Sequence, residues 1–222
     1  MSTTVQSLAK LPFLSGLDEE ALRALAPHVQ QRVLAPGQVI VLEAEPCQSV
    51  YLVASGLVRI RRLSQEGREQ VLSYIGTGGS FNLVSALDGG ASLATVDVVS
   101  RATVYAIPCE HFRRLIREHP EIAVVVSEQL AAEVRRLSDL VESLALYTVR
   151  TRLARFLLSA GGMQRPPRRW TQQEIAAHIG TVREMVGRTL RAFTDEGWIR
   201  RQRGRLMIVD REGLMRIASG SD

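Results

Sequence analysis

The sequence has very little cysteine: Cys47 and Cys109 are the only two among 222 residues. Two thiols exclude a disulfide scaffold, a four-cysteine zinc site and a four-cysteine iron–sulfur cluster, and no metal site is predicted. No apolar run approaches the roughly 20 residues that cross a bilayer. The N-terminus also lacks the basic start and apolar stretch of a signal peptide. These absences favour a cytoplasmic protein with reduced thiols.

Lysine is almost absent as well, since Lys10 is the only one. The segment 150–222 instead carries 15 arginines and 7 acidic residues, a net charge of +8, whereas the preceding residues carry −3. An arginine-rich final third on a mildly acidic body indicates that this third meets a polyanion such as nucleic acid. The alternative is a solvated arginine face. The 45% hydrophobic content is ordinary for a globular protein.

Short apolar runs separated by turn signals fill the stretch from Gln31 to about Ile107. Turn residues recur between them, for example at Ser55–Gly56 and Asp88–Gly90. Many short strands at such spacing predict an antiparallel sandwich or barrel. The runs are Val39–Leu42, Val50–Val53, Leu57–Ile60, Gln70–Ile75, Thr95–Val99 and Thr103–Ile107.

After Pro120 the apolar residues recur every three or four positions, and neither Gly nor Pro occurs between Glu121 and Ala160. This pattern predicts one long helix of roughly 25 residues, about 38 Å in length. An apolar stripe of this length is typical of a coiled-coil seam and favours a homodimer. The alternative is a helix packed on its own domain. The predicted interface comprises Ile122, Val126, Leu130, Val134, Leu137, Val141 and Leu144.

A helix-turn-helix pattern begins at Thr171, where Thr171 and Glu174 fit a capping box. The small Ala176 allows two helices to cross closely, Gly180 supplies a positive φ at the turn, and Val186 anchors the second helix on the core. The remaining buried side is predicted to comprise Ile175, Ile179, Leu190 and Phe193.

The second helix leaves Arg183, Glu184, Gly187 and Arg188 exposed in this phasing. Arginine reads guanine O6 and N7 with two hydrogen bonds, and glutamate accepts one from cytosine N4. We therefore predict base contacts in the major groove for Arg183, Glu184 and Arg188. Two alternatives remain open: Glu184 could serve a capping box with Thr181, or it could pair with Arg188 four residues later.

The segment from Trp198 to Val209 is typical of a hairpin with its turn near Arg203–Gly204, which makes the domain a winged helix-turn-helix. Exposed arginines on such a wing fit phosphate contacts, which set affinity and salt dependence. The predicted phosphate contacts are Thr171, Gln172, Thr181, Arg203 and Arg205.

The order of these segments resembles the CRP/FNR family of bacterial transcription regulators over nearly the whole chain. Leu34–Ile40 with Ser49–Val58 is similar to the start of the family's cyclic-nucleotide-binding-type β-roll, and Gln172–Ala176 with Val182–Leu190 is the most specific match. The resemblance implies a homodimer that binds a near-palindromic operator, contacts RNA polymerase and is switched through the β-roll.

The expected fold class is therefore α+β. It has an N-terminal antiparallel, jelly-roll-like β-roll (1–118), a long dimerisation helix (119–147) and a C-terminal winged helix-turn-helix (148–222).

The chain departs from the family's cyclic AMP binders at the phosphate cassette. Those relatives carry Phe-Gly-Glu-Leu, whereas this chain has Phe81–Val84, with Leu83 in place of the glutamate that holds the ribose. The stretch Ser92–Val96 also lacks the arginine that pairs with the phosphate, and a buried phosphate without a cation is costly. We expect no cyclic AMP binding of the usual kind. Candidate effector-pocket residues are Phe81, Asn82, Leu83, Ser92, Leu93 and Thr95.

Three ways of switching the protein remain open from the sequence. The pocket is empty and the protein is controlled by its abundance; or it holds an apolar effector or haem; or Cys47 and Cys109 sense oxidants. Candidate axial ligands for a haem are His28, His111 and His119.

An enzyme is the first rival function, but the sequence has no Gly-x-Ser-x-Gly, His-Glu-x-x-His or Gly-Lys-Ser/Thr motif. Glu174 and His178 lie one turn apart, on a helix whose structural role already explains them. We therefore expect no enzyme. The second rival is a cyclic-nucleotide-binding-like module that regulates a protein partner, which would have no use for the exposed Arg183, Glu184 and Arg188.

Overall fold

The computed structural model describes residues 5–162, 170–202 and 205–220, without the side chains of 160–162 and 205. The chain divides into two compact units. The first unit comprises Met1–Arg62 and Leu72–Arg135, and the second comprises Leu63–Val71 and Arg136–Asp222. No helix in the described part of the chain has the length and apolar character that a membrane crossing requires.

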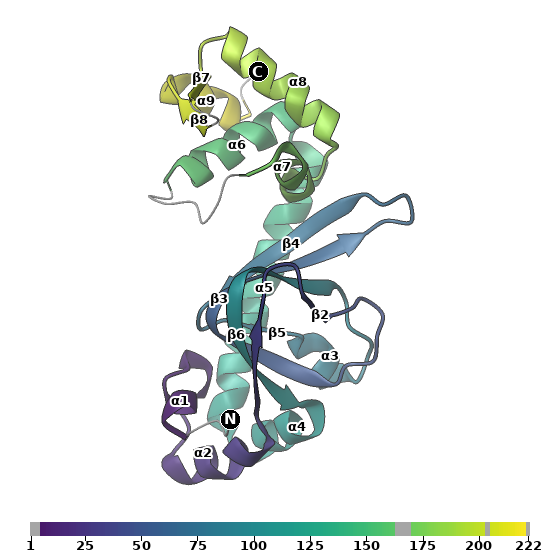
Figure 1. Ribbon diagram of the computed structural model, residues 1–222, viewed down its shortest axis with the longest axis vertical. Helices are drawn as coiled ribbons and strands as arrows, with labels where there is room; N and C mark the ends of the chain where they lie inside the picture. Colours follow the sequence, from purple (N-terminus) through teal and green to yellow (C-terminus); the bar gives the residue numbers. More distant parts are fainter. Residues whose placement is uncertain (1–4, 163–169, 203–204, 221–222) are drawn as a thin grey trace. The chain divides into compact units, whose positions relative to one another are not determined.

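One antiparallel sheet dominates the first unit (Figure 1). Its strands run in the order β1-β6-β3-β4, with β2 also paired to β6 and β5 to β3. This arrangement agrees with the predicted β-roll. The strands are β1 (Gln30–Leu34), β2 (Val39–Val41), β3 (Ser49–Leu63), β4 (Glu69–Gly76), β5 (Ser80–Phe81) and β6 (Thr95–Pro108).

The predicted division into short strands is wrong for β3 and β6, each of which joins two predicted runs into one strand. Ser55–Gly56 forms an irregularity inside β3, where the register with β6 shifts. Gly56 has φ +89°, and a Cβ there would lie 2.3 Å from the carbonyl oxygen of Arg101. Gly56 is thus required because two bent strands approach each other closely, and it does not reverse the chain.

Helices gather at one end of this sheet and close the main core of the first unit there (Figure 1). Phe13, Phe112 and Ile122 are among the fully buried side chains there, and they come from one 3₁₀ turn and two α-helices. The helices are α1 (Val5–Ala9), α2 (Glu19–Leu25), α3 (Leu83–Asp88), α4 (Cys109–Glu118) and α5 (Pro120–Leu146), with 3₁₀ turns at Pro12–Leu14 and Ala26–His28. From Arg136 on, α5 belongs to the second unit.

A buried ion cluster lies on β3 and β6. Asp97 accepts hydrogen bonds from Nε of Arg59 at 3.0 Å, Nη2 of Arg59 at 2.7 Å and Nε of Arg61 at 2.9 Å. Burial alone would raise the pKa of Asp97, but the hydrogen bonds and charges of the two arginines hold it below its usual value. The cluster therefore stays ionised and ties the two strands together.

The second unit packs its helices around one core that includes Leu153, Ile175, Phe193 and Leu214. A two-stranded antiparallel hairpin pairs Ile199 with Ile208 and completes the unit. Its elements are α6 (Val149–Gly162), α7 (Gln172–Ile179), α8 (Arg183–Asp195), β7 (Ile199–Gln202), β8 (Arg205–Ile208) and α9 (Arg211–Ala218).

Local signals around α7 have the predicted geometry. The Thr171 hydroxyl accepts a hydrogen bond from Glu174 N at 3.2 Å, and Glu174 Oε2 accepts one from Thr171 N at 2.8 Å, which is a capping box. Gly180 ends the helix with φ +68°. Ala176 and Val186 are fully buried, as the helix-turn-helix pattern requires. The helix-turn-helix prediction is thus confirmed in its local detail.

Candidate nucleic-acid interface

The outer face of α8 carries Arg183, Glu184 and Arg188, all exposed. The opposite face packs on the core of the second unit through Val186 and Phe193, both fully buried. Because a helix turns once every 3.6 residues, burial of one face fixes the direction of the other. The structure therefore presents the three side chains predicted for base contacts on one outward surface.

The structure around the start of α8 tests the two other roles considered for Glu184, a capping box with Thr181 and an ion pair with Arg188. The N-cap residue is Val182, and no side chain caps this helix. Among the described residues, no ion pair or hydrogen bond joins Glu184 to Arg188, although four-residue spacing would allow one. The Glu184 carboxylate is thus engaged neither in a capping box with Thr181 nor in a pair along the helix.

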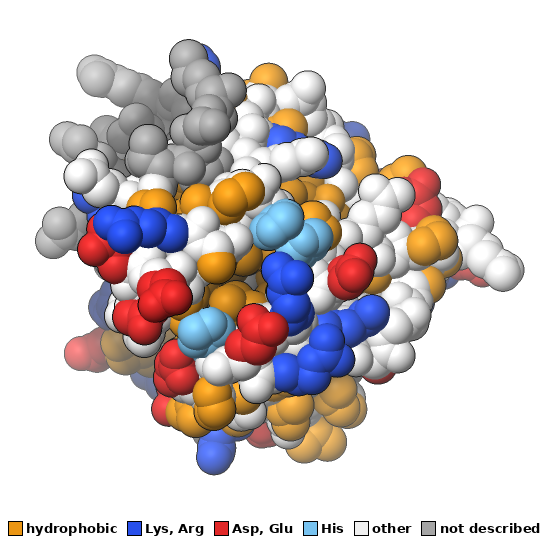
Figure 2. All heavy atoms as spheres, turned by 90° about the horizontal axis from the view of Figure 1, so that it is seen from below, with side chains coloured by type: hydrophobic (Ala, Val, Ile, Leu, Met, Phe, Trp, Pro, Cys, Tyr) orange, Lys and Arg blue, Asp and Glu red, His pale blue; other side chains and the backbone are white. Residues whose placement is uncertain are grey.

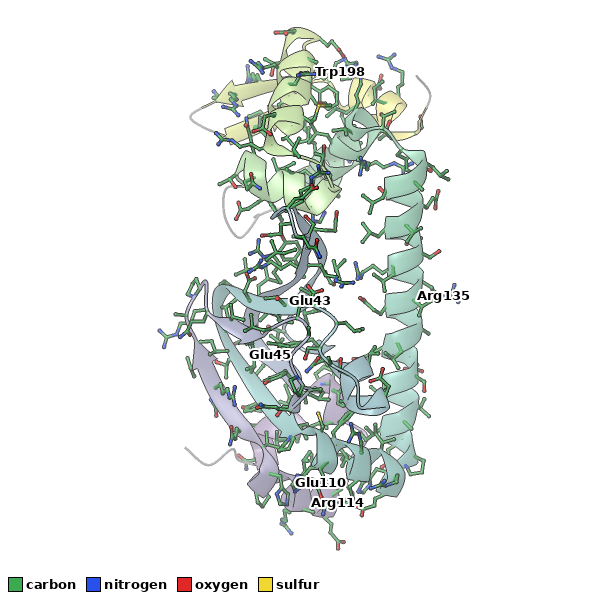
Figure 3. The ribbon with its side chains drawn as sticks, turned by 90° about the vertical axis from the view of Figure 1, so that its right-hand side faces the viewer. Glu43, Glu45, Glu110, Arg114, Arg135 and Trp198 are labelled. Atoms are coloured by element: carbon green, nitrogen blue, oxygen red, sulfur yellow. The ribbon has the colours of Figure 1, made fainter. Side chains whose placement is uncertain are left out.

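Arg150 contacts residues at the C-terminal end of α8. Its guanidinium donates to Glu196 Oε2 at 2.6 Å and lies 5.2 Å from the ring centroid of Phe193 and 4.9 Å from that of Trp198. Trp198 immediately precedes β7 and lies near the C-terminal end of α8 (Figure 3). This stack of charge and aromatic rings joins α6, α8 and the hairpin, so that the outward face of α8 has a rigid base.

The hairpin carries exposed arginines at Arg200 and Arg201, on β7. Of the two wing arginines predicted for phosphate contact, Arg203 lies outside the described residues. Only the backbone of Arg205 is described, and it pairs with Gln202 in the hairpin. One residue was missed by the sequence reasoning: Arg191 is exposed on α8, three residues after Arg188, and it lengthens the basic face. Extending the helical periodicity of α8 by one more turn would have predicted that Arg191 is exposed.

The other predicted phosphate contacts lie at the start of α7 and in the turn after it. Thr171 is exposed, but its hydroxyl already accepts from Glu174 N and donates to Glu174 Oε2 at 3.0 Å. Gln172 and Thr181 are half-buried. Thr171 therefore fixes the helix end first, and a phosphate contact there would have to share a hydroxyl that has two partners.

The long helix α5 has 27 residues, close to the predicted length. Ile122 and Val126 are buried in the core of the first unit, and Leu130 packs against the same core. Further along, Leu137 is half-buried and Leu144 is 39% exposed. Both Val134 and Val141 are 66% exposed.

The first residues of the predicted dimer interface are thus buried in the core of their own chain. The later ones, Val134 and Val141 above all, leave apolar side chains exposed to solvent. Arg135 projects outward from the same stretch of helix (Figure 3).

The phosphate-cassette positions are filled by packing in the first unit. Phe81 is buried and stacks on Tyr51 with ring centroids 4.9 Å apart. Leu83, which the sequence predicts to stand where cyclic AMP binders carry glutamate, is 7% exposed and belongs to the main core. Asn82 precedes α3 with φ +68°, and its Nδ2 donates to Ser49 O at 3.1 Å. None of these side chains offers a charge to a phosphate or an acceptor pair to a ribose.

The second group of pocket candidates lies on the segment that leads into β6. Ser92 is buried, and its backbone exchanges hydrogen bonds with Ala44 and Glu45. The buried Thr95 hydroxyl accepts from Glu43 N at 3.1 Å. Leu93 is 57% exposed. The hydrogen bonds of Ser92 and Thr95 therefore hold the loop that contains Glu43 and Glu45 (Figure 3).

The candidate haem ligands lie on the 3₁₀ turn Ala26–His28, on α4 and just before α5. Figure 2 shows histidine side chains among acidic and basic ones. His28 stacks on His111 with ring centroids 3.7 Å apart, and His119 Nδ1 lies 3.2 Å from Glu121 Oε1. Desolvation, then the charges of His111 and Arg114, lower the pKa of His28. In the described part of the chain, no group of three or more His, Cys, Asp and Glu side chains is arranged to hold a metal ion.

The sheet of the first unit and the α7–α8 arrangement of the second define the class of the protein as a β-roll domain joined to a winged helix-turn-helix domain. Residues 31–119 match the cyclic nucleotide-binding domain family, and residues 151–217 match the Crp-like helix-turn-helix domain family.

Relatives match along nearly the whole chain. A CRP-like cAMP-activated global transcriptional regulator of Mycobacterium tuberculosis is 30% identical over 219 residues, covering 95% of this chain and 98% of that one. The cyclic AMP receptor protein of Thermus thermophilus is 31% identical over 210 residues, covering 94% and 97%. The chain belongs to the CRP/FNR family of transcription regulators.

A solved structure agrees in fold. A transcriptional regulator of the CRP/FNR family from Eubacterium rectale superimposes with a TM-score of 0.81 at 23% identity, covering 94% of this chain and 98% of that one. The relatives with known names are transcription regulators rather than enzymes.

Proposed function

We propose that two copies of this chain bind a near-palindromic operator, with Arg183, Glu184 and Arg188 of each copy reading G·C pairs in successive major grooves. The single observation that carries this proposal is the outward face of α8. Three side chains suited to G·C recognition are exposed there, while the opposite face is buried. Arg200 and Arg201 on the hairpin, together with the predicted contacts Arg203 and Arg205, supply the phosphate contacts that set affinity.

The dimer is supported by the exposed apolar side chains of α5. Val134 and Val141 are one heptad apart, and so are Leu137 and Leu144, which is the spacing of a coiled-coil seam. Apolar side chains that are 66% exposed in the single chain gain most from a second helix. In the dimer the two α8 helices would lie about 34 Å apart, one turn of DNA.

The base-reading proposal is tested by selecting an operator from random duplexes and measuring affinity by fluorescence anisotropy. Arg188→Ala should cost roughly 1–3 kcal/mol on the selected operator and relax base choice at one position in each half-site. Arg216→Ala removes the same charge from an exposed site on α9 and serves as the matched control. Equal losses on selected and random duplex for Arg188→Ala would refute base reading by this residue.

We further propose that cyclic AMP does not switch this protein in the usual way, although the relatives' names include cAMP activation. The proposal is supported by Leu83, which is buried in the core, and by the lack of arginine between Ala91 and Val96. We expect operator affinity to stay constant when cyclic AMP is added. An increase of about tenfold or more, equivalent to 1.4 kcal/mol, would contradict this expectation.

The bound dimer is proposed to activate transcription through contact with RNA polymerase, as family membership implies. Transcription in vitro from a promoter carrying the selected operator, with and without the protein, tests this step. A fall in transcript would instead identify a repressor.

A further inference from the structure

The only two cysteines of the chain meet in the first unit, although 62 residues separate them in the sequence. Their Sγ atoms lie 3.0 Å apart, and both thiols are free. Cys109 Sγ also donates to the carbonyl oxygen of Cys47 at 3.4 Å. A disulfide has an S–S distance of about 2.05 Å, so the two sulfurs need to approach by roughly 1 Å.

The backbone fixes this approach. Ser49 of β3 pairs with Pro108 of β6, and Cys109 N donates to Gln48 O at 3.0 Å just beyond that pair. Continuing this register opposes Gln48 to Cys109, so Cys47 lies one residue beyond the pair, just before β3. The sulfurs of Cys47 and Cys109 therefore meet beyond the end of the β3–β6 pairing, which brings the two segments together.

Cys47 also accepts a hydrogen bond from Asn82, the residue that precedes α3. Asn82 Nδ2 donates to Cys47 Sγ at 3.3 Å and to Ser49 O at 3.1 Å. Asn82 has φ +68°, in the left-handed region that a non-glycine residue adopts only when its surroundings hold it there. No side chain caps the start of α3. The two hydrogen bonds of Asn82 therefore anchor the first turn of this helix.

We propose that Cys47 and Cys109 form an oxidation site, at which a hydroperoxide converts the two thiols to an intrachain disulfide and so weakens the anchor of α3. The site is independent of the proposed DNA binding. Through Asn82 its consequence reaches the segment Phe81–Val84, which the sequence resemblance predicts to correspond to the phosphate cassette.

The roles of the two sulfurs differ. Cys109 is the first residue of α4, a ten-residue helix whose leading N–H groups favour negative charge nearby. Burial, followed by the hydrogen bond to Cys109, raises the pKa of the Cys47 thiol to about 12. From its place at the start of α4, Cys109 is assigned the first attack, and Cys47, which is the more exposed of the two, is assigned the second.

The reaction balances as follows. After Cys109 releases its proton to solvent, its sulfur attacks one oxygen of the peroxide, the O–O bond breaks, and the other oxygen leaves and takes up a proton as water or alcohol. Cys47 then attacks the sulfenic sulfur, the S–S bond forms, and the hydroxyl departs as water with the Cys47 proton. Two thiols have lost two electrons and two protons, and the peroxide has been reduced.

The first test is chemical and uses the full chain without DNA. The reduced protein is treated with hydrogen peroxide, quenched with catalase and alkylated, then digested with trypsin under non-reducing conditions. We expect one cross-linked pair, peptide 33–59 with peptide 102–113, and loss of both free thiols. Dithiothreitol should restore both thiols, and Cys47→Ser should give no intrachain cross-link. Sulfinic acids without a cross-link, or cross-links only between chains, would overturn the proposal.

The second test follows hydrogen exchange of the amides of α3 (Leu83–Asp88). Oxidation should speed their exchange about fivefold, the effect of losing one ordinary hydrogen bond, and leave α9 unchanged. Asn82→Ala should speed the same amides in the reduced protein. Unchanged exchange of α3 on oxidation would refute the coupling to Asn82, even where the disulfide forms. Circular dichroism of each variant checks that the sheet is intact.

Discussion

Replacing Asp97 by Asn should destabilise the first unit by about 2–3 kcal/mol. The side chain of Asp97 is 8% exposed and accepts three hydrogen bonds from Arg59 and Arg61. Removal of one partner from a buried ion pair costs about 3–5 kcal/mol, because the remaining charge stays buried. The two arginine side chains keep 16% of their surface exposed, so water can reach them, and the lower range applies.

The two units can be followed separately in one denaturation experiment. Both tryptophans of the chain, Trp170 and Trp198, belong to the second unit, so tryptophan fluorescence reports on that unit alone. Circular dichroism also detects the sheet of the first unit. Asp97→Asn should lower the urea midpoint of the transition seen only by circular dichroism. Glu43→Gln is the control, because its partner Arg62 is 60% exposed and such pairs contribute less than about 1 kcal/mol.

The effect should depend on pH. Because the pKa of Asp97 is lower in the folded chain than its ordinary value of 3.8, the carboxylate stabilises the fold fully above that value. The stabilisation is lost as the pH falls through the folded pKa, and the difference from Asp97→Asn should shrink there. A loss below about 1 kcal/mol at neutral pH, or a shift of the tryptophan transition instead, would refute the role assigned to the cluster.

Three further changes test the second unit by tryptophan fluorescence. Thr171→Ala removes the helix cap and should cost about 1 kcal/mol, whereas an effect near zero would contradict the capping box. Gly180→Ala places a side chain at φ +68° and should cost about 1–2 kcal/mol; an unchanged midpoint would be inconsistent with that backbone conformation. Burial lowers the pKa of His178, so the unfolded state binds the proton more tightly. The second unit should therefore lose stability as the pH falls below about 6.5, and His178→Gln should remove this dependence.

The DNA-binding unit could be predicted closely from the sequence because its signals are local. A capping box at Thr171, a left-handed glycine at Gly180 and the periodicity of α8 each involve residues within one or two helical turns. Such patterns fix the phase of a helix and hence the side chains that it exposes. Arg191 was missed only because the phase was not followed far enough.

Features that depend on distant partners could not be predicted in the same way. A glycine such as Gly56 signals a left-handed backbone, but only the neighbouring strand decides between a turn and a bend inside a strand. Periodicity showed that α5 has an apolar stripe, but not that the core of its own unit covers Ile122 and Val126. The proximity of Cys47 and Cys109, 62 residues apart, likewise depends on the pairing of β3 with β6, at whose end they lie.

The central claim is that α8 reads guanines through Arg183 and Arg188, and methylation interference tests it most directly. Methylation of guanine N7 in the selected operator should block the native protein at one or two positions in each half-site, since N7 accepts the arginine hydrogen bond. The Arg188→Ala variant should have equal affinity for unmethylated duplex and for duplex methylated at one of these positions. If the variant keeps the full interference pattern of the native protein, Arg188 does not contact a guanine and the account of the interface is wrong.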